Sequence, residues 1–246
     1  MAMTWLPSGS QDEQCSRIVA VMSDRPEDDC AQRIREIYGD DLLEPAGVVH
    51  VTSTWSDPDG RLFSLRIGPD TPHSATDSFA LELARARADA IVTTGQILRD
   101  EPGLTNALRD PELGAWRRER LGKLEPPLTL VLSRGADLDR SHPLFAASEV
   151  SVRNASLRDS LGWLRDERGI ASVAIESGPS TVRALYDEPL AVDELMLSIC
   201  RTPLLPEGAR GAELFDLSVL DRLFEQRSEC TREEQSGTWS FLRFRA

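Results

Sequence analysis

Two polar segments of this sequence each follow a short apolar run, and both could hold a negatively charged ligand. Residues 171–175 lead into Glu176-Ser-Gly-Pro-Ser-Thr181, and residues 89–94 lead into Gly95-Gln96. Where a strand passes into a helix, unpaired main-chain N–H groups point outward and attract an anion. The same residues also occur in ordinary strand-to-helix turns, and this interpretation is favoured for the loop at Gly95-Gln96. The two loops alone therefore leave open the choice between a turn and a phosphate site.

Three ionisable side chains accompany these loops. Glu176 ends an apolar run, where a carboxylate is costly unless it caps N–H groups, pairs with an arginine or meets a ligand. Asp100 lies close to Pro102 and is either a solvated turn carboxylate or a site residue. His73 precedes Ser74 at an expected helix start, where it either neighbours a cap or donates to a phosphate when protonated. For each of the three residues, a structural role and a role in a binding site both stay open.

Composition excludes several classes of function. The chain has 246 residues, 28 basic and 41 acidic side chains and a net charge of −13, so a nucleic-acid partner is disfavoured. A small anion can still be bound by local arginines. Lys123 is the only lysine, which argues against Schiff-base chemistry. Neither the dinucleotide-binding pattern GxGxxG nor the P-loop pattern GxxxxGK[ST] occurs, so the commonest nucleotide-binding motifs are excluded.

The cysteines and histidines give no metal-binding pattern. The four cysteines are far apart in the sequence, and the chain has only three histidines. No stretch approaches the length of a membrane span, and the first residues lack the apolar core of a signal peptide. We therefore expect no metal, no membrane partner and a cytoplasmic location.

The order of elements predicts one α/β domain of mostly parallel strands, with antiparallel strands at one edge. We expect two short helices in residues 12–38, helices from residue 76, at 112–121 and at 157–167, and strands at 47–55, 61–66, 89–94, 128–132, 171–175, 192–200 and 237–245. In such sheets ligands bind at the carboxyl ends of the strands. The loops after Thr54, Thr94 and Ile175 are therefore the candidate site.

Six motifs in order resemble one known family. They are Val51-Thr-Ser-Thr-Trp-Ser56 with Asp59-Gly60, then residues 85–95, Arg99-Asp-Glu-Pro-Gly-Leu-Thr105, Ile175-Glu-Ser-Gly-Pro179, Val192-Asp-Glu-Leu195 and residues 203–211. This order resembles the reductase domain of riboflavin biosynthesis, the C-terminal half of the bifunctional riboflavin-specific deaminase/reductase. The resemblance implies a dihydrofolate reductase-like domain at residues 46–246, a three-layer α/β/α fold with antiparallel C-terminal strands, after a helical extension at residues 1–45.

The resemblance also implies a reaction. Members of the family reduce 5-amino-6-(5-phosphoribosylamino)uracil with NADPH, and hydride passes to C1′ of the ribosyl group. The protein holds donor and acceptor together and neutralises phosphates, while the cofactor supplies the chemistry. A homodimer and a small-molecule substrate are expected by the same analogy.

Site residues are carried over by motif. Glu176 and Asp100 are the expected catalytic residues. The cofactor is expected at Thr54, Trp55, Thr94, Gly95, Gln96, Asp100, Ser133, Ser177, Gly178, Pro179, Ser180 and Thr181. The substrate is expected at His73, Ser74, Arg85, Leu104, Arg109 and Glu176.

The sequence departs from the family pattern in several places. Ser177 replaces a glycine or alanine, the turn at residues 55–60 is longer, and Gly95-Gln-Ile-Leu98 lacks a hydroxyl expected near the cofactor. Arg109 stands later than the arginine that usually follows the Leu-Thr motif. The zinc signature of the deaminase half does not occur, so we expect a stand-alone reductase.

Three hypotheses remain from the sequence. The chain is either such a reductase, a degenerate member that keeps cofactor binding or dimer formation without turnover, or a reductase of the same fold acting on another heterocycle such as a pterin. An acidic residue on a helix beside the ring pocket would mark the pterin case. The sequence alone does not identify one.

Overall fold

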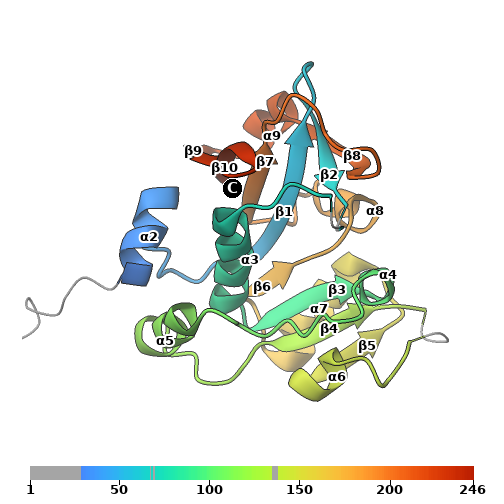
Figure 1. The fold of residues 1–246 in the computed structure, drawn as a ribbon. Coiled ribbons are helices and arrows are strands. Elements are labelled where there is room, and N and C mark those ends of the chain that lie inside the picture. The colour runs from blue at the N-terminus through green and yellow to red at the C-terminus, as the bar shows by residue number, and fades with distance from the viewer. Residues whose placement is uncertain (1–28, 67, 69, 135–137) are drawn as a thin grey trace, which may run out of the picture.

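A single mixed sheet organises the chain (Figure 1). The computed structural model describes residues 29–66, 68, 70–134 and 138–246. Its helices are α2 (Asp29–Tyr38), α3 (Ala75–Arg87), α4 (Gly95–Asp100), α5 (Pro111–Arg120), α6 (Leu144–Ala147), α7 (Leu157–Arg168), α8 (Pro179–Val182) with the 3₁₀ turn η1 (Arg183–Leu185), and α9 (Leu217–Leu223). Its strands are β1 (Val48–Ser56), β2 (Arg61–Leu65), β3 (Ala90–Thr94), β4 (Leu128–Leu132), β5 (Val150–Arg153), β6 (Val173–Ile175), β7 (Glu194–Cys200), β8 (Arg210–Asp216), β9 (Gln226–Glu234) and β10 (Gly237–Arg245).

The strand order is β5-β4-β3-β6-β1-β7-β10-β9, and β2 and β8 extend from the far end of β1. Strands β1, β3, β4, β5, β6 and β7 pair in parallel, whereas β10 runs antiparallel to β7 and β9. The predicted mostly parallel sheet with antiparallel C-terminal strands is therefore confirmed.

Local sequence explains where the helices begin and end. Side chains of Ser74, Asp110, Ser156 and Asp216 accept hydrogen bonds from the first-turn N–H groups of α3, α5, α7 and α9. Helix α7 ends at Gly169, which has a φ of 65° that favours glycine. Helices α3, α5 and α7 lie where the sequence predicts helices, whereas the sequence does not predict α9.

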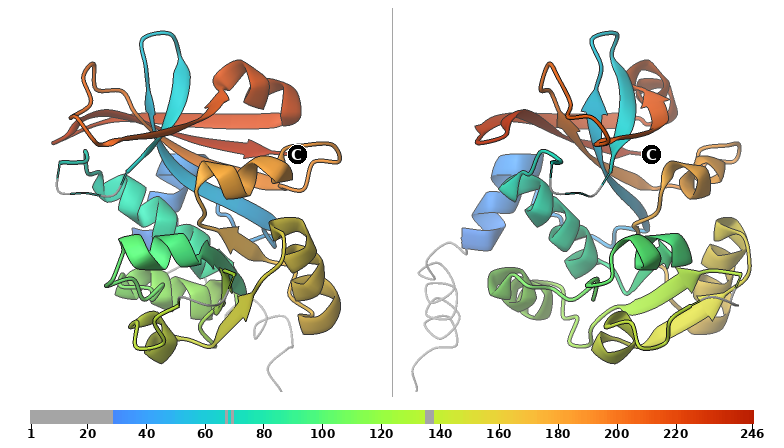
Figure 2. Two further views of the ribbon diagram at one scale, coloured as in Figure 1. Left: turned by 90° about the vertical axis from the view of Figure 1, so that its right-hand side faces the viewer. Right: turned by 45° about the vertical axis from the view of Figure 1, so that its right-hand side comes forward.

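Helices cover both faces of the sheet, as the two views in Figure 2 show. One apolar core joins α2, α3 and α5 to one face of β1, β3 and β7, and a second joins α7, η1 and α9 to the opposite face. Their most buried members include Ile34, Leu83 and Trp116 on the first face, and Leu164 and Leu220 on the second. This is the three-layer α/β/α arrangement expected from the sequence.

Helix α2 confirms the second of the two short helices expected before residue 38; the first lies outside the described residues. Ile34, Ile37 and Tyr38 are buried in the same core as α3 and α5. Asp40, just after the helix, accepts a hydrogen bond from Arg243 of β10 at 2.8 Å. Residues from 29 onward thus pack against the sheet, and a separate extension ending at residue 45 stays a prediction.

No described helix is both long enough and apolar enough to span a bilayer.

Candidate active site at the carboxyl ends of β3 and β6

A buried ion pair stands where β6 ends. Glu176 follows Ile175 directly, and its N–H donates to the carbonyl of Val92 in β3 at 2.9 Å. Arg85 of α3 donates from Nε to Oε1 and from Nη2 to Oε2, each at 2.6 Å. The side chains are only 5% and 11% exposed. Of the roles left open for Glu176, the structure shows pairing with an arginine in bidentate geometry.

Arg85 has further carboxylates around it. Burial disfavours its charged form, but the negative charges of Glu176, Glu82 and Glu101 outweigh this and hold the pKa of Arg85 above its ordinary value. Glu82 is itself engaged, because it accepts hydrogen bonds from the N–H groups of Arg109 and Asp110 at 2.9 and 2.8 Å. Glu101, at the end of α4, is the carboxylate of this group with the fewest partners.

The loop after Glu176 presents main-chain donors. In the described part of the chain no acceptor takes a hydrogen bond from the N–H groups of Ser177 or Gly178. A Cβ atom added to Gly178 would meet nothing within 4 Å, so the space before the loop is open. Helix α8 starts at Pro179 but ends after four residues and continues as the single turn η1. The donors therefore come from the loop, since so short a helix has little dipole of its own.

The loop after β3 is built from contacts between strand ends. The Thr94 hydroxyl caps α4 by accepting from the N–H of Ile97 at 3.3 Å. A Cβ atom on Gly95 would lie 2.8 Å from Oγ of Ser133, which follows β4. Glycine at position 95 is thus required for the close packing of Thr94, Gly95 and Ser133.

Two further predicted cofactor residues lie on the outside of α4. Gln96 and Asp100 are exposed, and the amide of Gln96 donates to Oδ1 of Asp100 at 2.8 Å. Arg99 in turn donates to the amide oxygen of Gln96 at 2.8 Å. These side chains hydrogen-bond to one another along the exposed surface of α4.

Thr54 and Trp55 lie farther along β1. Beyond its pairing with β6, which ends at His50, β1 continues beside β7 as far as Trp55. Thr54 donates to the carbonyl of Ser198 at 3.1 Å, and the indole N–H of Trp55 donates to the carbonyl of Thr202 at 2.8 Å. Both side chains are buried, so the polar atoms of these two predicted cofactor residues already have main-chain partners.

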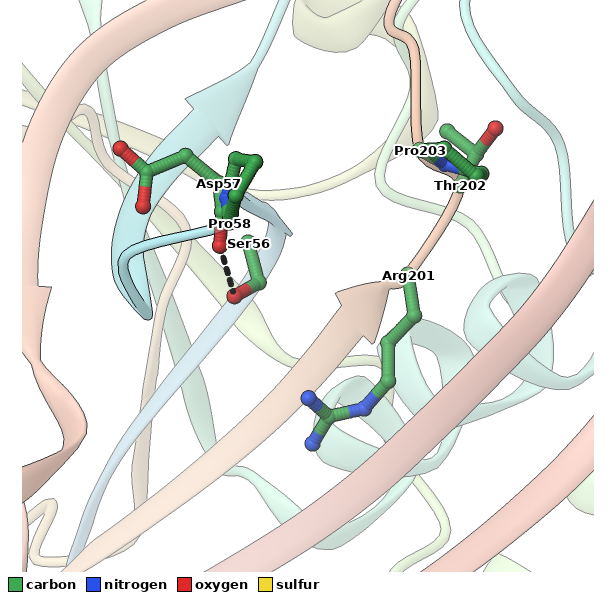
Figure 3. Close-up of a pocket in the computed structure, with 6 residues that line it drawn as sticks. All are labelled: Ser56, Asp57, Pro58, Arg201, Thr202 and Pro203. Carbon is green, nitrogen blue, oxygen red and sulfur yellow. Dashed lines mark hydrogen bonds between the residues drawn. The ribbon is translucent and has the colours of Figure 1, made fainter.

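Figure 3 shows a small cavity beyond Trp55. Its volume is about 210 Å³, and it is lined by Ser56, Asp57 and Pro58 at the end of β1 and by Arg201, Thr202 and Pro203 after β7. Ile175, which precedes Glu176, lies opposite His50 of β1, whereas the cavity begins at Ser56, six residues farther along the chain. The cavity is therefore separate from the Arg85–Glu176 pair. The cavity contains none of the predicted site residues.

The predicted substrate residues fall in four places. Arg85 and Glu176 form the pair above. His73 and Ser74 lie at the start of α3, where they line a hollow of about 760 Å³ together with residues 232–235 of the β9–β10 hairpin. Leu104 packs against the apolar group of Leu98, Val131 and Leu144, and Arg109, 76% exposed, pairs with Glu82 at 3.2 Å. The structure does not bring these six side chains together.

Sequence reasoning missed Asp77. Its carboxylate accepts a hydrogen bond from Oγ of Ser53 in β1 at 2.6 Å. Burial raises the pKa of Asp77, although hydrogen bonds from Ser53 and Ser198 oppose the shift. Asp77, Leu81 and Arg85 recur at intervals of four, which places them on one face of α3. That spacing is visible in the sequence, but the contact with Ser53 is not.

The described residues contain no group of three His, Cys, Asp or Glu side chains arranged to hold a metal ion. Within the same residues, the site offers a buried ion pair, the Glu101 carboxylate without a hydrogen-bond or salt-bridge partner, and unpaired main-chain N–H groups. Such an arrangement can orient a polar, phosphorylated ligand and move a proton.

Comparison with known proteins supports the architecture. The sequence matches no protein-family model and no curated protein. A pyrimidine reductase-like protein from Corynebacterium diphtheriae superimposes with a TM-score of 0.59 at 19% identity, over 87% of this chain and 98% of that one. RibD from Acinetobacter baumannii superimposes with a TM-score of 0.54 at 15% identity, over 84% of this chain and 59% of that one. At such identities the likeness shows the fold alone: this chain has the dihydrofolate reductase-like α/β fold of the pyrimidine reductase-like and RibD proteins.

Proposed function

We propose that this protein is an NADPH-dependent reductase that acts on the ribosylamino group of a phosphorylated ribosylaminopyrimidine. The observation that carries the proposal is the position of the Arg85–Glu176 pair directly beside the N–H groups of Ser177 and Gly178, which no described acceptor takes. A charged pair can orient sugar hydroxyls and a phosphate, and free amide donors can hold the phosphates of a dinucleotide. The fold shared with a pyrimidine reductase-like protein supports the same class of reaction.

The residues present suit a dinucleotide. Ser177 and Gly178 offer their N–H groups, open space lies before Gly178, and the hydroxyls of Ser180 and Thr181 follow in the next turn. Arg183, exposed in η1, adds a positive charge nearby. When bound, the nicotinamide would supply hydride to C1′ of the sugar. NADPH in preference to NADH, a homodimer and a cytoplasmic location stay predictions.

Cofactor binding is tested by thermal stability. At a concentration 100 times its Kd, NADPH would stabilise the folded protein by about 2.7 kcal/mol. Gly178→Trp would fill the space before the loop and remove this shift. Gly162→Trp is the matched control, because a Cβ on that α7 glycine also meets nothing within 4 Å. If neither NADPH nor NADH stabilises the wild type, the proposal fails.

Turnover is tested separately. The wild type is mixed with NADPH and 5-amino-6-(5-phosphoribosylamino)uracil, and oxidation of the nicotinamide is followed by absorbance. Cofactor binding without oxidation would instead favour the degenerate binding module.

A second candidate function is favoured by Asp77. A carboxylate on α3, held by Ser53, can accept two hydrogen bonds from the amino and ring N–H groups of a heterocycle such as a pterin. Here Asp77→Asn would weaken the affinity for the pterin while leaving NADPH binding intact. Comparison of the wild type on a dihydropterin and on the ribosylaminouracil phosphate separates the two candidates.

A further inference from the structure

Glu101 is fixed in place by its main chain, while its carboxyl group has no direct partner in the described part of the protein. Its N–H donates to the carbonyl of Ile97 at 2.8 Å, and its own carbonyl accepts from the N–H of Leu104 at 3.1 Å. The same carbonyl lies 3.0 Å from Nε2 of His142. Because Nδ1 of His142 accepts from the N–H of Leu144, Nε2 carries the hydrogen and donates to Glu101.

Glu101 follows β3 and α4 at the same edge of the sheet as the ion pair. Among the described residues its side chain has no hydrogen bond or salt bridge, although it lies close enough to Arg85 and Glu176 to interact electrostatically with both. Arg85 is already engaged by the bidentate contact with Glu176. The other charged neighbour, Asp100 on α4, is negative. The charge of Arg85 is thus already balanced by Glu176. Within the described residues, the Glu101 carboxylate therefore has no cation of its own.

This environment favours the protonated form. Burial raises the pKa of Glu101, and the charge of Glu176 and then of Asp100 adds to the effect, while Arg85 opposes it. Glu101 is also partly exposed, so water can return a proton to it after each turnover. A partly exposed carboxyl group whose pKa is raised in this way can donate a proton to a bound ligand.

Resting on the function proposed above, we propose that Glu101 is the acid that opens the pentose ring of the ribosylamino substrate, beside the Arg85–Glu176 pair. Its proton goes to the ring oxygen O4′, and the C1′–O4′ bond breaks with its electron pair going to that oxygen. The lone pair of the attached nitrogen forms the C1′=N bond of an open-chain iminium ion. Addition of one hydride to C1′ then gives the ribitylamino product, so one proton and one hydride enter per turnover.

His142 is a positioning residue in this scheme. It touches Glu101 only through the main-chain carbonyl, and it holds the end of α4 against the start of α6. No other role of His142 is needed.

The test compares Glu101→Gln with Glu119→Gln, which removes one charge from an exposed site on α5. Glu101→Gln is expected to lower kcat roughly 100-fold or more, with KM for the pyrimidine and Kd for NADP⁺ changed by less than about threefold. It also loses the fall in kcat/KM that the wild type shows as pH rises through the pKa of Glu101. Glu119→Gln is expected to match the wild type in each measurement.

Thermal stability supplies a readout that does not depend on turnover. The raised pKa means that ionisation of Glu101 weakens the fold as pH rises above the ordinary carboxyl pKa. Glu101→Gln should therefore melt higher than the wild type at pH 7.5, and the difference should shrink as pH falls to the ordinary carboxyl pKa. If Glu101 has only a structural role, Glu101→Gln will be less stable than the wild type. Its activity will then be either unchanged or reduced by the same factor at every pH.

The turnover of the variants separates the donor role from the proposed function. Equal turnover of Glu101→Gln and the wild type overturns the proton-donor role alone. A wild type that binds NADP⁺ but does not reduce the substrate overturns the proposed function and the donor role together. If Glu101→Gln does not fold, Glu101→Asp takes its place: kcat restored to within about tenfold of the wild type, with the alkaline limb of the profile displaced, supports the role, and an unchanged profile overturns it.

Discussion

Arg85 and Glu176, 91 positions apart, meet with both guanidinium–carboxylate hydrogen bonds at 2.6 Å across the space between α3 and β6. Each charge makes the other tolerable, because neither has much access to water. The pair thereby fixes α3 against the end of β6, where the 177–181 loop begins. It connects the fold directly to the candidate site.

Removing one member of this pair should destabilise the protein strongly. Arg85→Met leaves the Glu176 carboxylate buried without its cation, and we expect a loss of about 3–5 kcal/mol in the free energy of unfolding. Arg85→Met with Glu176→Leu should recover most of it. Arg165→Met, which breaks an exposed pair with Asp166, should leave the free energy of unfolding close to the wild-type value. Urea denaturation measures all three, and a small effect of Arg85→Met alone would show that the pair is solvated.

The sequence predicts the central strands because they are buried on both faces. The runs at residues 90–94, 128–132 and 194–200 are short and mostly apolar, and the structure places strands there. The sequence does not predict strands β8 and β9, since they carry many exposed polar side chains near the sheet margins. Strand β5 is four residues long and half-exposed, too short for a periodic signal.

The candidate site could be predicted only in part. Polar loops after two apolar runs indicate which strand ends to examine, and parallel strands bring such ends to one edge. Contacts between residues far apart in the chain, such as Ser53 with Asp77, depend on how α3 packs on the sheet. The sequence also predicts a helix after Gly178 without showing that it stops at Val182.

Gly95 should resist even the smallest side chain. A Cβ at this position would lie 2.8 Å from Oγ and 3.1 Å from Cβ of Ser133, so Gly95→Ala must displace the Ser133 side chain, which directly follows β4. We expect a loss of about 1–3 kcal/mol in stability. Adding Ser133→Gly should restore much of it by removing both contacts. Gly162→Ala in α7 meets no neighbour and should stabilise by about 0.5–1 kcal/mol. Thermal melts of the four proteins measure these differences, and a neutral Gly95→Ala would contradict the proposed close contact.

His50 should make stability depend on pH through the acidic range. It lies fully buried in β1 with Nδ1 2.6 Å from the hydroxyl of Tyr186, and Nε2 has no partner within the described residues. Burial lowers the pKa of His50 from 6.5 to about 3. Between these two pH values, His50 is therefore protonated in the unfolded chain and neutral in the folded chain. Stability from this residue is complete above pH 6.5 and is lost as pH falls toward 3, by about 1.4 kcal/mol per pH unit.

The variant His50→Gln separates this residue from the many carboxylates that also titrate in acid. It cannot take up the proton, so the difference in unfolding free energy between it and the wild type should shrink steadily as pH falls from about 6.5 to about 4. Urea denaturation at half-unit intervals of pH measures the slopes. Parallel curves for the wild type and His50→Gln would mean that His50 is protonated in the folded protein, in conflict with its sealed position beside Tyr186.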